Sequence, residues 1–481
     1  MPMPSTFTDQ TAANPHPDWP ALLTDAGLGL LDAAGRFMPA PVSLTPYHLT
    51  EAQWQQALDA GRLLGLLQQR VAQQADWLLR QFSSLKAELS LPGQLAQLLQ
   101  IPHNHHNANA VSLQRHDLML DQQNQWRWIE SNPIAAGMGP LNALWLDLLR
   151  AEHPGAYADN PATAAQADLL YSAAAQHAGT RQPQIVFVVE AQEDNWFDQQ
   201  LLADALQQRG AQIQRLTLAQ LQQAVDASAS PTGTLYYGPD PLDLLYFRTG
   251  YNQADYPSAQ LWQLRLQLEQ FDLLLCPTLL QQLAGSKWLQ LKLAQYLQQA
   301  DLHPAFAAQF GFSLAETQQL AALTVPMVAV DEVSSAEFDQ LITQGWWYKR
   351  QAEGGGNVAR GAQAQQWRQA HQPGDGDVLM APVAASGRPE VLQKLVRGQW
   401  QTAPEQRSSH ISELGIFSLG EDARYGGYLL RTKTSNSLEG GVHKGFAVLD
   451  TVWLETDADS ENSAEALFAA RSGLSQTEAR L

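Results

Sequence analysis

The chain has 481 residues, of which 45% are apolar and 16% are charged, so it is long enough for about three domains with an ample core. Its formal net charge of −19 argues against nucleic acid or an anionic membrane as a partner. The single cysteine, Cys276, excludes an internal disulfide framework and a thiolate metal cluster, and its apolar neighbours favour a buried, inert thiol over a nucleophile. No apolar stretch approaches the ~20 residues of a membrane span, and no signal-peptide pattern opens the sequence, so we expect a cytoplasmic protein.

The first strand-like segments carry a candidate metal site. Arg115 opens one such run, and aromatic and polar residues alternate over 126–130 as they do in a strand. Glu130 and Asn132 are two residues apart and therefore lie on the same face. A carboxylate and an amide at a strand end suit Mg²⁺, which prefers oxygen ligands. The histidine-rich stretch 103–107 is polar and follows a proline, so we predict a surface loop there rather than a transition-metal site.

A βαβ unit follows. Residues 185–190 form a continuous apolar run typical of a buried parallel strand, 196–209 have helical spacing, and 211–218 form the next strand. Ligands of such units normally bind beyond the carboxyl ends of the strands. Three polar side chains occupy that edge in the sequence: Glu193, Asn195 and Gln199.

Two more segments place cations at the ends of expected elements. The buried strand within 244–251 runs into Arg248, and residues 282–287 end in Lys287, just before a helical stretch that opens at Trp288. A single strand-end arginine is more often part of an ordinary surface ion pair than of a ligand site.

Residues 346–357 are the most informative stretch of the chain. An aromatic, strand-like run ends in Lys349, the carboxylate of Glu353 follows four residues later, and Gly354, Gly355 and Gly356 come next. Such a lysine neutralises phosphate charge, such a carboxylate takes a divalent cation, and glycine backbone closes over phosphates. It is not a Walker A loop, because the lysine precedes the glycines. A mobile surface loop is the alternative; the strand and the two charged residues favour phosphate binding.

The last segment is a strand over 427–433 with a glycine-containing loop at 439–445 and a further strand at 446–450. With the preceding segments, the chain has four strand-end arginines, two glycine loops and two candidate metal carboxylates. This combination points to one anionic ligand site. We expect fraying or disorder at both ends, over 1–17 and 455–481.

These motifs resemble those of the eukaryotic-type glutathione synthetase family of the ATP-grasp superfamily. The matching segments run from about residue 115 to 450, and several are long and family-specific. They are 129–132, 193–199, 246–251, 282–287, 353–357, 412–417 and 430–433, the last leading to 440–442.

The resemblance implies roles for individual residues. Mg²⁺ would be held by Glu130, Asn132 and Glu353. ATP would be bound by Lys287, Lys349, Gly354, Gly355, Gly356, Asn357, Glu413 and Lys433, with the hinge from Met380 to Val383 facing adenine. The γ-glutamyl dipeptide would be recognised by Arg115, Glu193, Asn195, Gln199, Arg248 and Tyr251. The carboxylate of the incoming amino acid would be held by Arg431 and the backbone of Val442 and His443, with Arg431 and Lys349 as the catalytic residues.

The sequence departs from the family pattern at positions near both substrates. Ala135 and Gly137 stand where the family has two serines, near the dipeptide. His443 and Lys444 stand where the family has an alanine-rich lid over the glycine site. These two side chains either point to solvent, which we favour, or select an acceptor other than glycine.

The resemblance implies an α/β ATP-grasp fold with an inserted parallel βαβ-type substrate-binding domain. The expected boundaries are 1–182 for the N-terminal part of the body, 183–290 for the inserted domain, 291–319 for the return to the body, 320–405 for the lid with its glycine-rich loop, 406–454 for the C-terminal part of the body and 455–481 for a flexible tail. The implied function is ATP- and Mg²⁺-dependent ligation of γ-glutamylcysteine to glycine through an acyl phosphate, by a homodimer. The alternatives are a γ-glutamyl-dipeptide ligase with a different acceptor, and a nucleotide-binding relative that has lost ligation.

Overall fold

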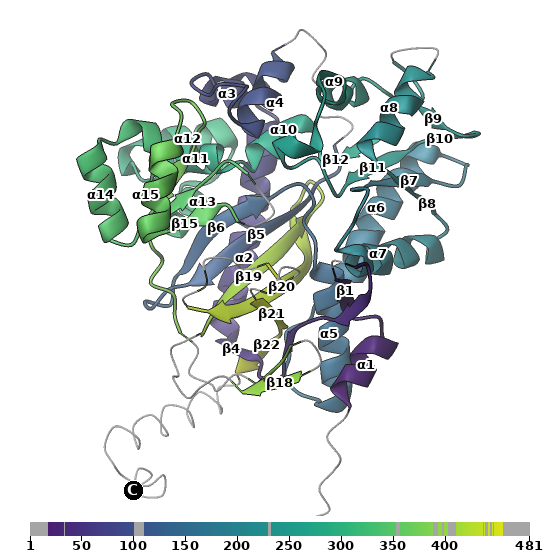
Figure 1. The fold of residues 1–481 in the computed structure, drawn as a ribbon, viewed down its shortest axis with the longest axis horizontal. Helices are drawn as coiled ribbons and strands as arrows, with labels where there is room; N and C mark the ends of the chain where they lie inside the picture. The colour runs from purple at the N-terminus through teal and green to yellow at the C-terminus, as the bar shows by residue number, and fades with distance from the viewer. Residues whose placement is uncertain are drawn as a thin grey trace, which may run out of the picture.

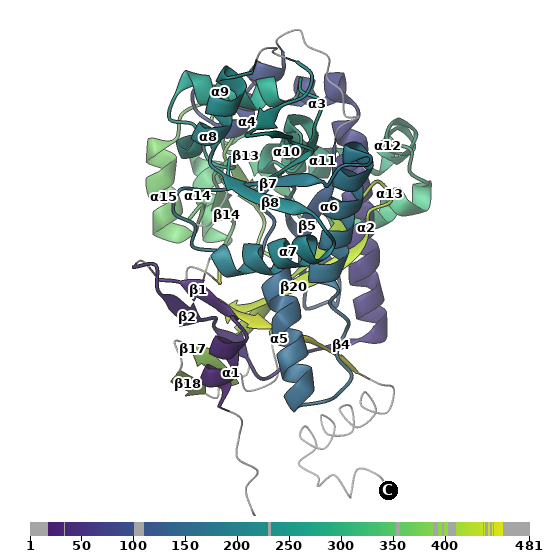
Figure 2. The ribbon, with the colours of Figure 1, turned by 90° about the vertical axis from the view of Figure 1, so that its right-hand side faces the viewer.

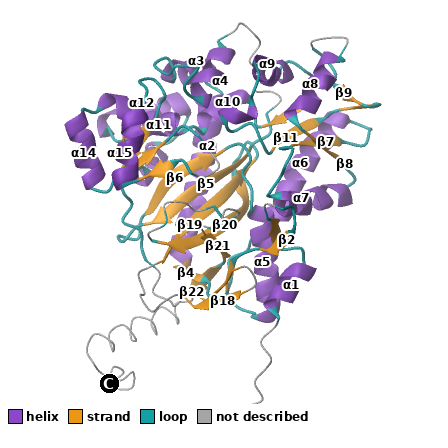
Figure 3. Cartoon of the chain, in the orientation of Figure 1, coloured by secondary structure: helices purple, strands orange, loops and turns teal. Residues whose placement is uncertain are grey.

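The computed structural model of the protein describes residues 18–32, 34–100, 110–228, 232–352, 356–387, 393–396, 399–402, 410–435, 437, 441–442, 445 and 447–455. The fold is mixed α/β (Figure 3). Three sheets of four or more strands dominate the described part of the chain, and the largest lies between the other two (Figure 1).

The central sheet has eight strands in the order β18-β17-β3-β21-β20-β19-β5-β6, and neighbouring strands are antiparallel except for β21 and β3. In chain order its strands are β3 (Val42–Ser43), β5 (Leu113–Leu120), β6 (Trp126–Asn132), β17 (Gln393–Val396), β18 (Gln399–Thr402), β19 (His410–Leu419), β20 (Arg424–Thr434) and β21 (Ala447–Asp450).

Helices cover both faces of this sheet. The long helix α2 (Glu51–Ala72) packs against β5, β19 and β20, whereas α5 (Gly139–Glu152) and α6 (Ala162–Ala178) also contact β20. Because side chains alternate along a strand, Ile416 of β19 belongs to the α2-side core and its neighbour Phe417 to the α5-side core. The central sheet is therefore buried on two sides over part of its length.

The second sheet is parallel and has four strands in the order β12-β11-β7-β8. Its strands are β7 (Gln184–Val188), β8 (Gln212–Leu216), β11 (Leu244–Phe247) and β12 (Leu274–Cys276). Helix α7 (Trp196–Gln208) connects β7 to β8, as the predicted βαβ unit requires, and packs on α5 and α6. Cys276 is buried, and burial raises the pKa of its thiol to about 12, which agrees with the expected inert side chain.

The third sheet is antiparallel, with the order β13-β16-β14-β15. Its strands are β13 (Met327–Ala329), β14 (Trp347–Lys349), β15 (Val358–Ala359) and β16 (Val378–Met380), and helices α14 (Ser335–Thr343) and α15 (Gly361–Ala370) flank it at the left of Figure 1. The predicted lid range of 320–405 extends beyond this sheet, because β17 pairs with β3 of the central sheet. Strands β17 and β18 lie beside α1 and the β1–β2 pair, far from α14 and α15 (Figure 2).

The remaining elements complete the layers around these sheets. They are α1 (Trp19–Asp25), β1 (Gly29–Leu31), β2 (Phe37–Pro39), β4 (Tyr47–Thr50), α3 (Ala75–Gln81), α4 (Leu91–Leu99), α8 (Leu218–Asp226), β9 (Tyr236–Tyr237), β10 (Asp240–Pro241), α9 (Ala259–Leu268), α10 (Leu279–Ala284), α11 (Lys287–Leu297), α12 (His303–Phe310), α13 (Leu314–Leu323) and β22 (Val452–Glu455).

The elements expected from the sequence differ from the observed ones mainly at their ends. The helix expected at Trp288 begins one residue earlier, at Lys287, because the side chain of Ser286 caps it by accepting a hydrogen bond from the backbone N–H of Leu289. The strand expected over 427–433 is longer, since β20 begins at Arg424. The predictions for 1–17, 103–107 and 456–481 lie outside the described residues.

Candidate functional site

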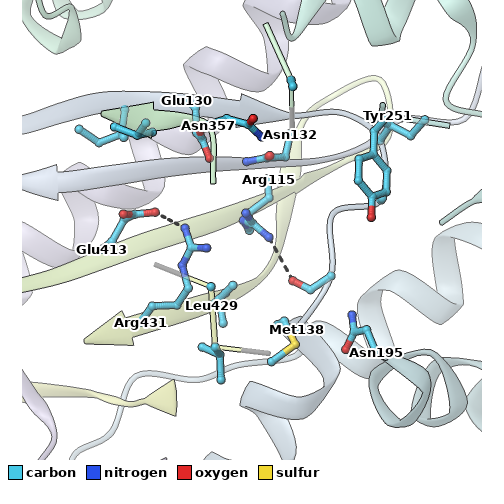
Figure 4. Close-up of a pocket in the computed structure, with 18 of the residues that line it drawn as sticks. Arg115, Glu130, Asn132, Met138, Asn195, Tyr251, Asn357, Glu413, Leu429 and Arg431 are labelled. Atoms are coloured by element: carbon cyan, nitrogen blue, oxygen red, sulfur yellow. Dashed lines mark hydrogen bonds and ion pairs between the residues drawn. The ribbon is translucent and has the colours of Figure 1, made fainter. Parts of the chain in front are cut away.

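A cavity of about 210 Å³ lies where the three sheets meet. The central sheet lines it with side chains of β5, β6, β19 and β20, the third sheet with Trp347 and Lys349, and the parallel sheet and its loops with Asn195 and Arg248 (Figure 4). Most of the described residues that we predicted to bind ligands line this cavity.

The pleat of the central sheet explains why charged groups gather on one face. Glu413 and Arg431, which are cross-strand partners on β19 and β20, line the cavity, whereas their neighbours Leu414 and Leu430 belong to the core under α2. One face of the same strands thus packs in the core, while the other presents charged side chains to the cavity.

A register shift in β6 aims the candidate metal residues at this cavity. Trp128 pairs with Leu118 and is part of the core, yet Glu130, two residues on, pairs with Asp117 and lines the cavity. Strict alternation would keep Trp128 and Glu130 on one face, so the bulge at Ile129 is what turns Glu130 away from the core. The carbonyl oxygen of Ile129 accepts a hydrogen bond from Lys349 Nζ at 3.0 Å, which ties the bulge to the third sheet.

Asp117 organises the centre of the site. Its buried carboxylate accepts hydrogen bonds from Arg115 Nε at 2.6 Å and Nη2 at 2.8 Å, and from Arg431 Nη2 at 3.0 Å. The Nδ2 group of Asn132 donates to the same carboxylate at 3.1 Å, which leaves Asn132 Oδ1 as the ligand oxygen of that side chain. One carboxylate therefore fixes two arginines and the candidate metal amide.

A second carboxylate, that of Glu413, pairs with Arg431 and lies 3.7 Å from Lys433 Nζ. Burial alone would lower the pKa of the Arg431 guanidinium, but Glu413 and Asp117 raise it above its ordinary value. Arg431 is thus a permanent, oriented cation in the cavity (Figure 4).

Glu130 faces the lysines that the sequence assigned to phosphate. Its carboxylate lies 3.6 Å from Lys349 Nζ, and Lys287 Nζ donates to the carbonyl oxygen of Ala352 at 3.0 Å. Burial would raise the pKa of Glu130, but Lys349, Lys287 and two arginines lower it to about 2. The carboxylate is therefore ionised at neutral pH, as a metal ligand must be.

Arg248 occupies the side of the cavity formed by the parallel sheet. Its Nη1 donates to the carbonyl oxygen of Ala136 at 3.1 Å, and its Nη2 lies 3.6 Å from Asp198. A Cβ atom added to Gly137 would collide with this guanidinium and lie 3.1 Å from the Asp198 carboxylate. Gly137, where the resemblance implied a serine, therefore leaves space for Arg248.

The other predicted dipeptide residues divide into two groups. Glu193, Asn195 and Tyr251 line the cavity, and the side chain of Glu193 accepts a hydrogen bond from the backbone N–H of Asn195 at 3.1 Å. Gln199 does not line it: its buried Oε1 accepts from Arg215 Nη1 at 2.6 Å. Gln199, one helical turn beyond Asn195, is therefore buried outside the cavity wall.

The predicted adenine hinge lies beside the cavity and not in its wall. Met380 is buried in β16, with its sulfur 3.7 Å from Lys349 Nζ, and Val383 is half-buried beyond the strand end. Gly356 has a φ of +79°, a backbone conformation that L side chains rarely adopt, and Asn357 lines the cavity.

The structure describes only some of the residues of the predicted acceptor lid and glycine-rich loop. Val442 and Lys433 line the cavity. Four predicted site residues, Glu353, Gly354, Gly355 and His443, lie outside the described residues, as does Lys444.

Sequence reasoning missed two buried aspartates. Asp117 stands two residues after Arg115 on one strand, so the same-face spacing that paired Glu130 with Asn132 also applied to it. Asp198 lies in the first turn of α7, where an acidic residue is ordinary, so no signal distinguished it.

None of the helices in the described parts of the chain combines the length and apolar composition that crossing a bilayer requires.

Comparisons with known proteins show the family of the chain. Residues 32–454 match the family described as eukaryotic glutathione synthase, ATP binding domain. The chain is 29% identical over 447 residues to the chloroplastic glutathione synthetase of Solanum lycopersicum, covering 86% of this chain and 78% of that protein. It is 26% identical over 457 residues to the glutathione synthetase of Xenopus laevis, covering 86% and 90% of the two chains.

A solved structure shares the fold. It is the apo form of GSS30, a glutathione synthetase like-effector from Globodera pallida, with a TM-score of 0.64 and 14% identity over 90% of this chain and 95% of that one. At this identity the likeness concerns the fold alone. The family match, in contrast, spans most of the sequence, and the chain therefore belongs to the eukaryotic glutathione synthase family.

Proposed function

We propose that this protein is an ATP- and Mg²⁺-dependent ligase that joins γ-glutamylcysteine to glycine, forming glutathione. One observation carries the proposal: Glu130, Lys287, Lys349 and Arg431, which come from separate segments of the chain, line one cavity. A carboxylate for a metal, two lysines for phosphate and an arginine for a substrate carboxylate are what carboxylate activation by ATP requires.

The donor dipeptide would bind against the parallel sheet. Arg248 and Arg115 present guanidinium groups for its carboxylates, and Glu193 presents a carboxylate for its ammonium group. Within the part of the chain that the structure describes, Arg248 Nε and Asn195 Oδ1 are buried without a hydrogen-bond partner. Because unpaired buried polar atoms are costly, these two support a polar ligand at this position.

The donor set also fits Mg²⁺. An ionised Glu130 and the Oδ1 atom of Asn132 are hard oxygen ligands, and we propose that Glu353 supplies a third. When bound, the ion would neutralise negative charge on the nucleotide phosphates. Lys287, Lys349, Lys433 and the glycine-rich loop would hold the phosphates, with adenine toward the Met380–Val383 hinge.

The reaction then needs no enzyme nucleophile. The C-terminal carboxylate of the dipeptide attacks the γ-phosphorus of ATP, a bond forms between oxygen and phosphorus, and the bond to the β-phosphate oxygen breaks to release ADP. The amine of glycine attacks the carbonyl carbon of the acyl phosphate, loses a proton and expels inorganic phosphate. Arg431, fixed by Asp117 and Glu413, would hold the glycine carboxylate and place the amine for attack.

We further propose that the parallel sheet is the inserted substrate-binding domain and that the third sheet is the lid of an ATP-grasp fold. The glycine-rich loop would follow β14 and lead into β15. A homodimer, as the resemblance implies, is part of the proposal, and size-exclusion chromatography with light scattering tests it.

Phosphate release from ATP, measured with γ-glutamylcysteine and a panel of amino acids, tests the function. Release that depends on both the dipeptide and glycine is expected. Release with another amino acid and none with glycine would replace the acceptor, which is the alternative that His443 and Lys444 raised from the sequence. Nucleotide binding without phosphate release for any amine would favour a relative that has lost ligation.

A further inference from the structure

A cluster of histidine and aspartate side chains lies in the third sheet, outside the cavity described above. His371 ends helix α15, and the segment that leads from it into β16 carries Asp375 and Asp377. One ligand atom from each of these three side chains lies within 4.8 Å of the other two. The His371 side chain is 4% exposed and that of Asp375 is 16% exposed, so the donors are held in place by their surroundings.

The orientation of the His371 ring is fixed from its far side. Its Nε2 lies 2.6 Å from Asp331 Oδ1, and the other oxygen of Asp331 accepts a hydrogen bond from the Gly374 backbone at 2.8 Å. Nδ1 therefore faces Asp375, whose Oδ2 is 2.8 Å away. Metal-binding histidines characteristically donate the N–H of their second ring nitrogen to a carboxylate. Here that carboxylate belongs to Asp331, which is not one of the three converging side chains.

Negative charge is in excess at the converging side. The carboxylates of Asp375 and Asp377 converge beside His371 and repel each other, and the Tyr348 hydroxyl donates a hydrogen bond to Asp377 Oδ2 at 2.8 Å. A cation between the two carboxylates would relieve this repulsion. The site is also reachable, because a cavity of about 280 Å³ is lined by His371, Asp375 and Asp377.

We propose that His371 Nδ1, Asp375 and Asp377 bind a divalent transition-metal ion, of the class of Zn²⁺ or Co²⁺, at a site separate from the nucleotide cavity. An imidazole nitrogen with two carboxylates suits these ions, whereas Mg²⁺ prefers oxygen ligands alone. The site contacts Gln351, which precedes the glycine-rich stretch in the sequence: Asp377 Oδ1 accepts from the Gln351 backbone at 3.2 Å, and Gln351 Nε2 donates to the Gly376 carbonyl at 2.8 Å.

The test is a Co²⁺ titration of the full chain after chelator treatment, in excess Mg²⁺, followed by visible absorption and by metal analysis after gel filtration. About one Co²⁺ per chain is expected, with a d–d absorption band that shows protein ligands. His371→Gln and Asp375→Asn should each weaken binding by about tenfold or more. Asp375→Asn is the more conservative change and keeps the test valid if the histidine variant does not fold.

The chain offers a matched control. His177 also has a carboxylate at each ring nitrogen, Asp243 at 2.9 Å and Asp272 at 3.4 Å, but one ligand atom from each of these three side chains does not come within 4.8 Å of the other two. His177→Gln should leave Co²⁺ binding unchanged. Less than half an equivalent of bound Co²⁺, or equal binding by the wild type and Asp375→Asn, would overturn the proposal.

Discussion

Asp117→Asn is the most direct perturbation of the proposed active site. The carboxylate accepts three hydrogen bonds from two buried arginines, Arg115 and Arg431, at 2.6–3.0 Å. Asparagine has the same shape as aspartate, but an NH₂ group replaces one of its two acceptor oxygens. This NH₂ group would face the N–H donors of a guanidinium. The two arginines would then lose the charge that fixes them.

The size of the effect follows from these contacts. Breaking a buried ion pair by changing one partner costs about 3–5 kcal/mol, and for a chain of this size we expect the unfolding midpoint to fall by roughly 5 °C or more. Because Arg115 serves the proposed donor site and Arg431 the proposed acceptor site, kcat/KM should fall by roughly a hundredfold for both substrates.

The assay is steady-state phosphate release with donor and acceptor varied separately, together with thermal unfolding. Asp121→Asn is the control: its carboxylate lies just past the end of β5 and pairs with Arg127 of β6 at 2.8 Å, outside the cavity. It should leave both KM values unchanged. A normal KM for both substrates in Asp117→Asn would refute the view that this carboxylate positions the arginines.

Further predictions concern residues with distinct roles. Glu353→Gln should lower kcat by several orders of magnitude in the phosphate-release assay, since a metal ligand would be lost. Arg248→Ala should raise the KM for the dipeptide far more than that for ATP, and equal effects would show that Arg248 is misplaced. Replacing both His443 and Lys444 by alanine should keep the glycine KM within a few-fold, as for a surface change. Burial lowers the pKa of His116 from 6.5 to about 3, so the unfolded state binds more protons between these values and stability falls as the pH drops through that window. The loss should be roughly 2 kcal/mol between pH 6.5 and about 4.5, and His116→Gln should show a flatter pH dependence of the unfolding free energy.

The order of strands and helices near the site could be read from the sequence because local signals agree there. The apolar run of β7, the spacing of α7 and the strand end at Arg248 each follow from side-chain periodicity. The cations also converge, as expected, but only Arg248 follows a strand of the parallel sheet, whereas Lys349 and Arg431 lie on antiparallel strands.

The pairing of strands that are far apart in the sequence could not be predicted in this way. Strands β17 and β18 follow the third sheet in the chain, but β17 pairs with β3, more than 300 residues earlier. The bulge at Ile129 arises from pairing between β5 and β6, so no pattern within β6 alone reveals it. Asp198 of α7 was missed for a similar reason: its partner Arg248 follows β11, in a distant part of the sequence.

The replacement at position 137 and the environment of Arg248 are best understood together. A serine there would add atoms where the guanidinium now lies, so a side chain at 137 and this placement of Arg248 exclude each other. Asp198, buried beside Arg248, neutralises it, while the Ala136 carbonyl accepts a hydrogen bond from it. Gly137 thus presents no side-chain hydroxyl, and the Arg248 guanidinium occupies the space that a side chain at this position would need. On this reasoning the glycine at 137 alters how the proposed donor site would hold a dipeptide and does not remove that site.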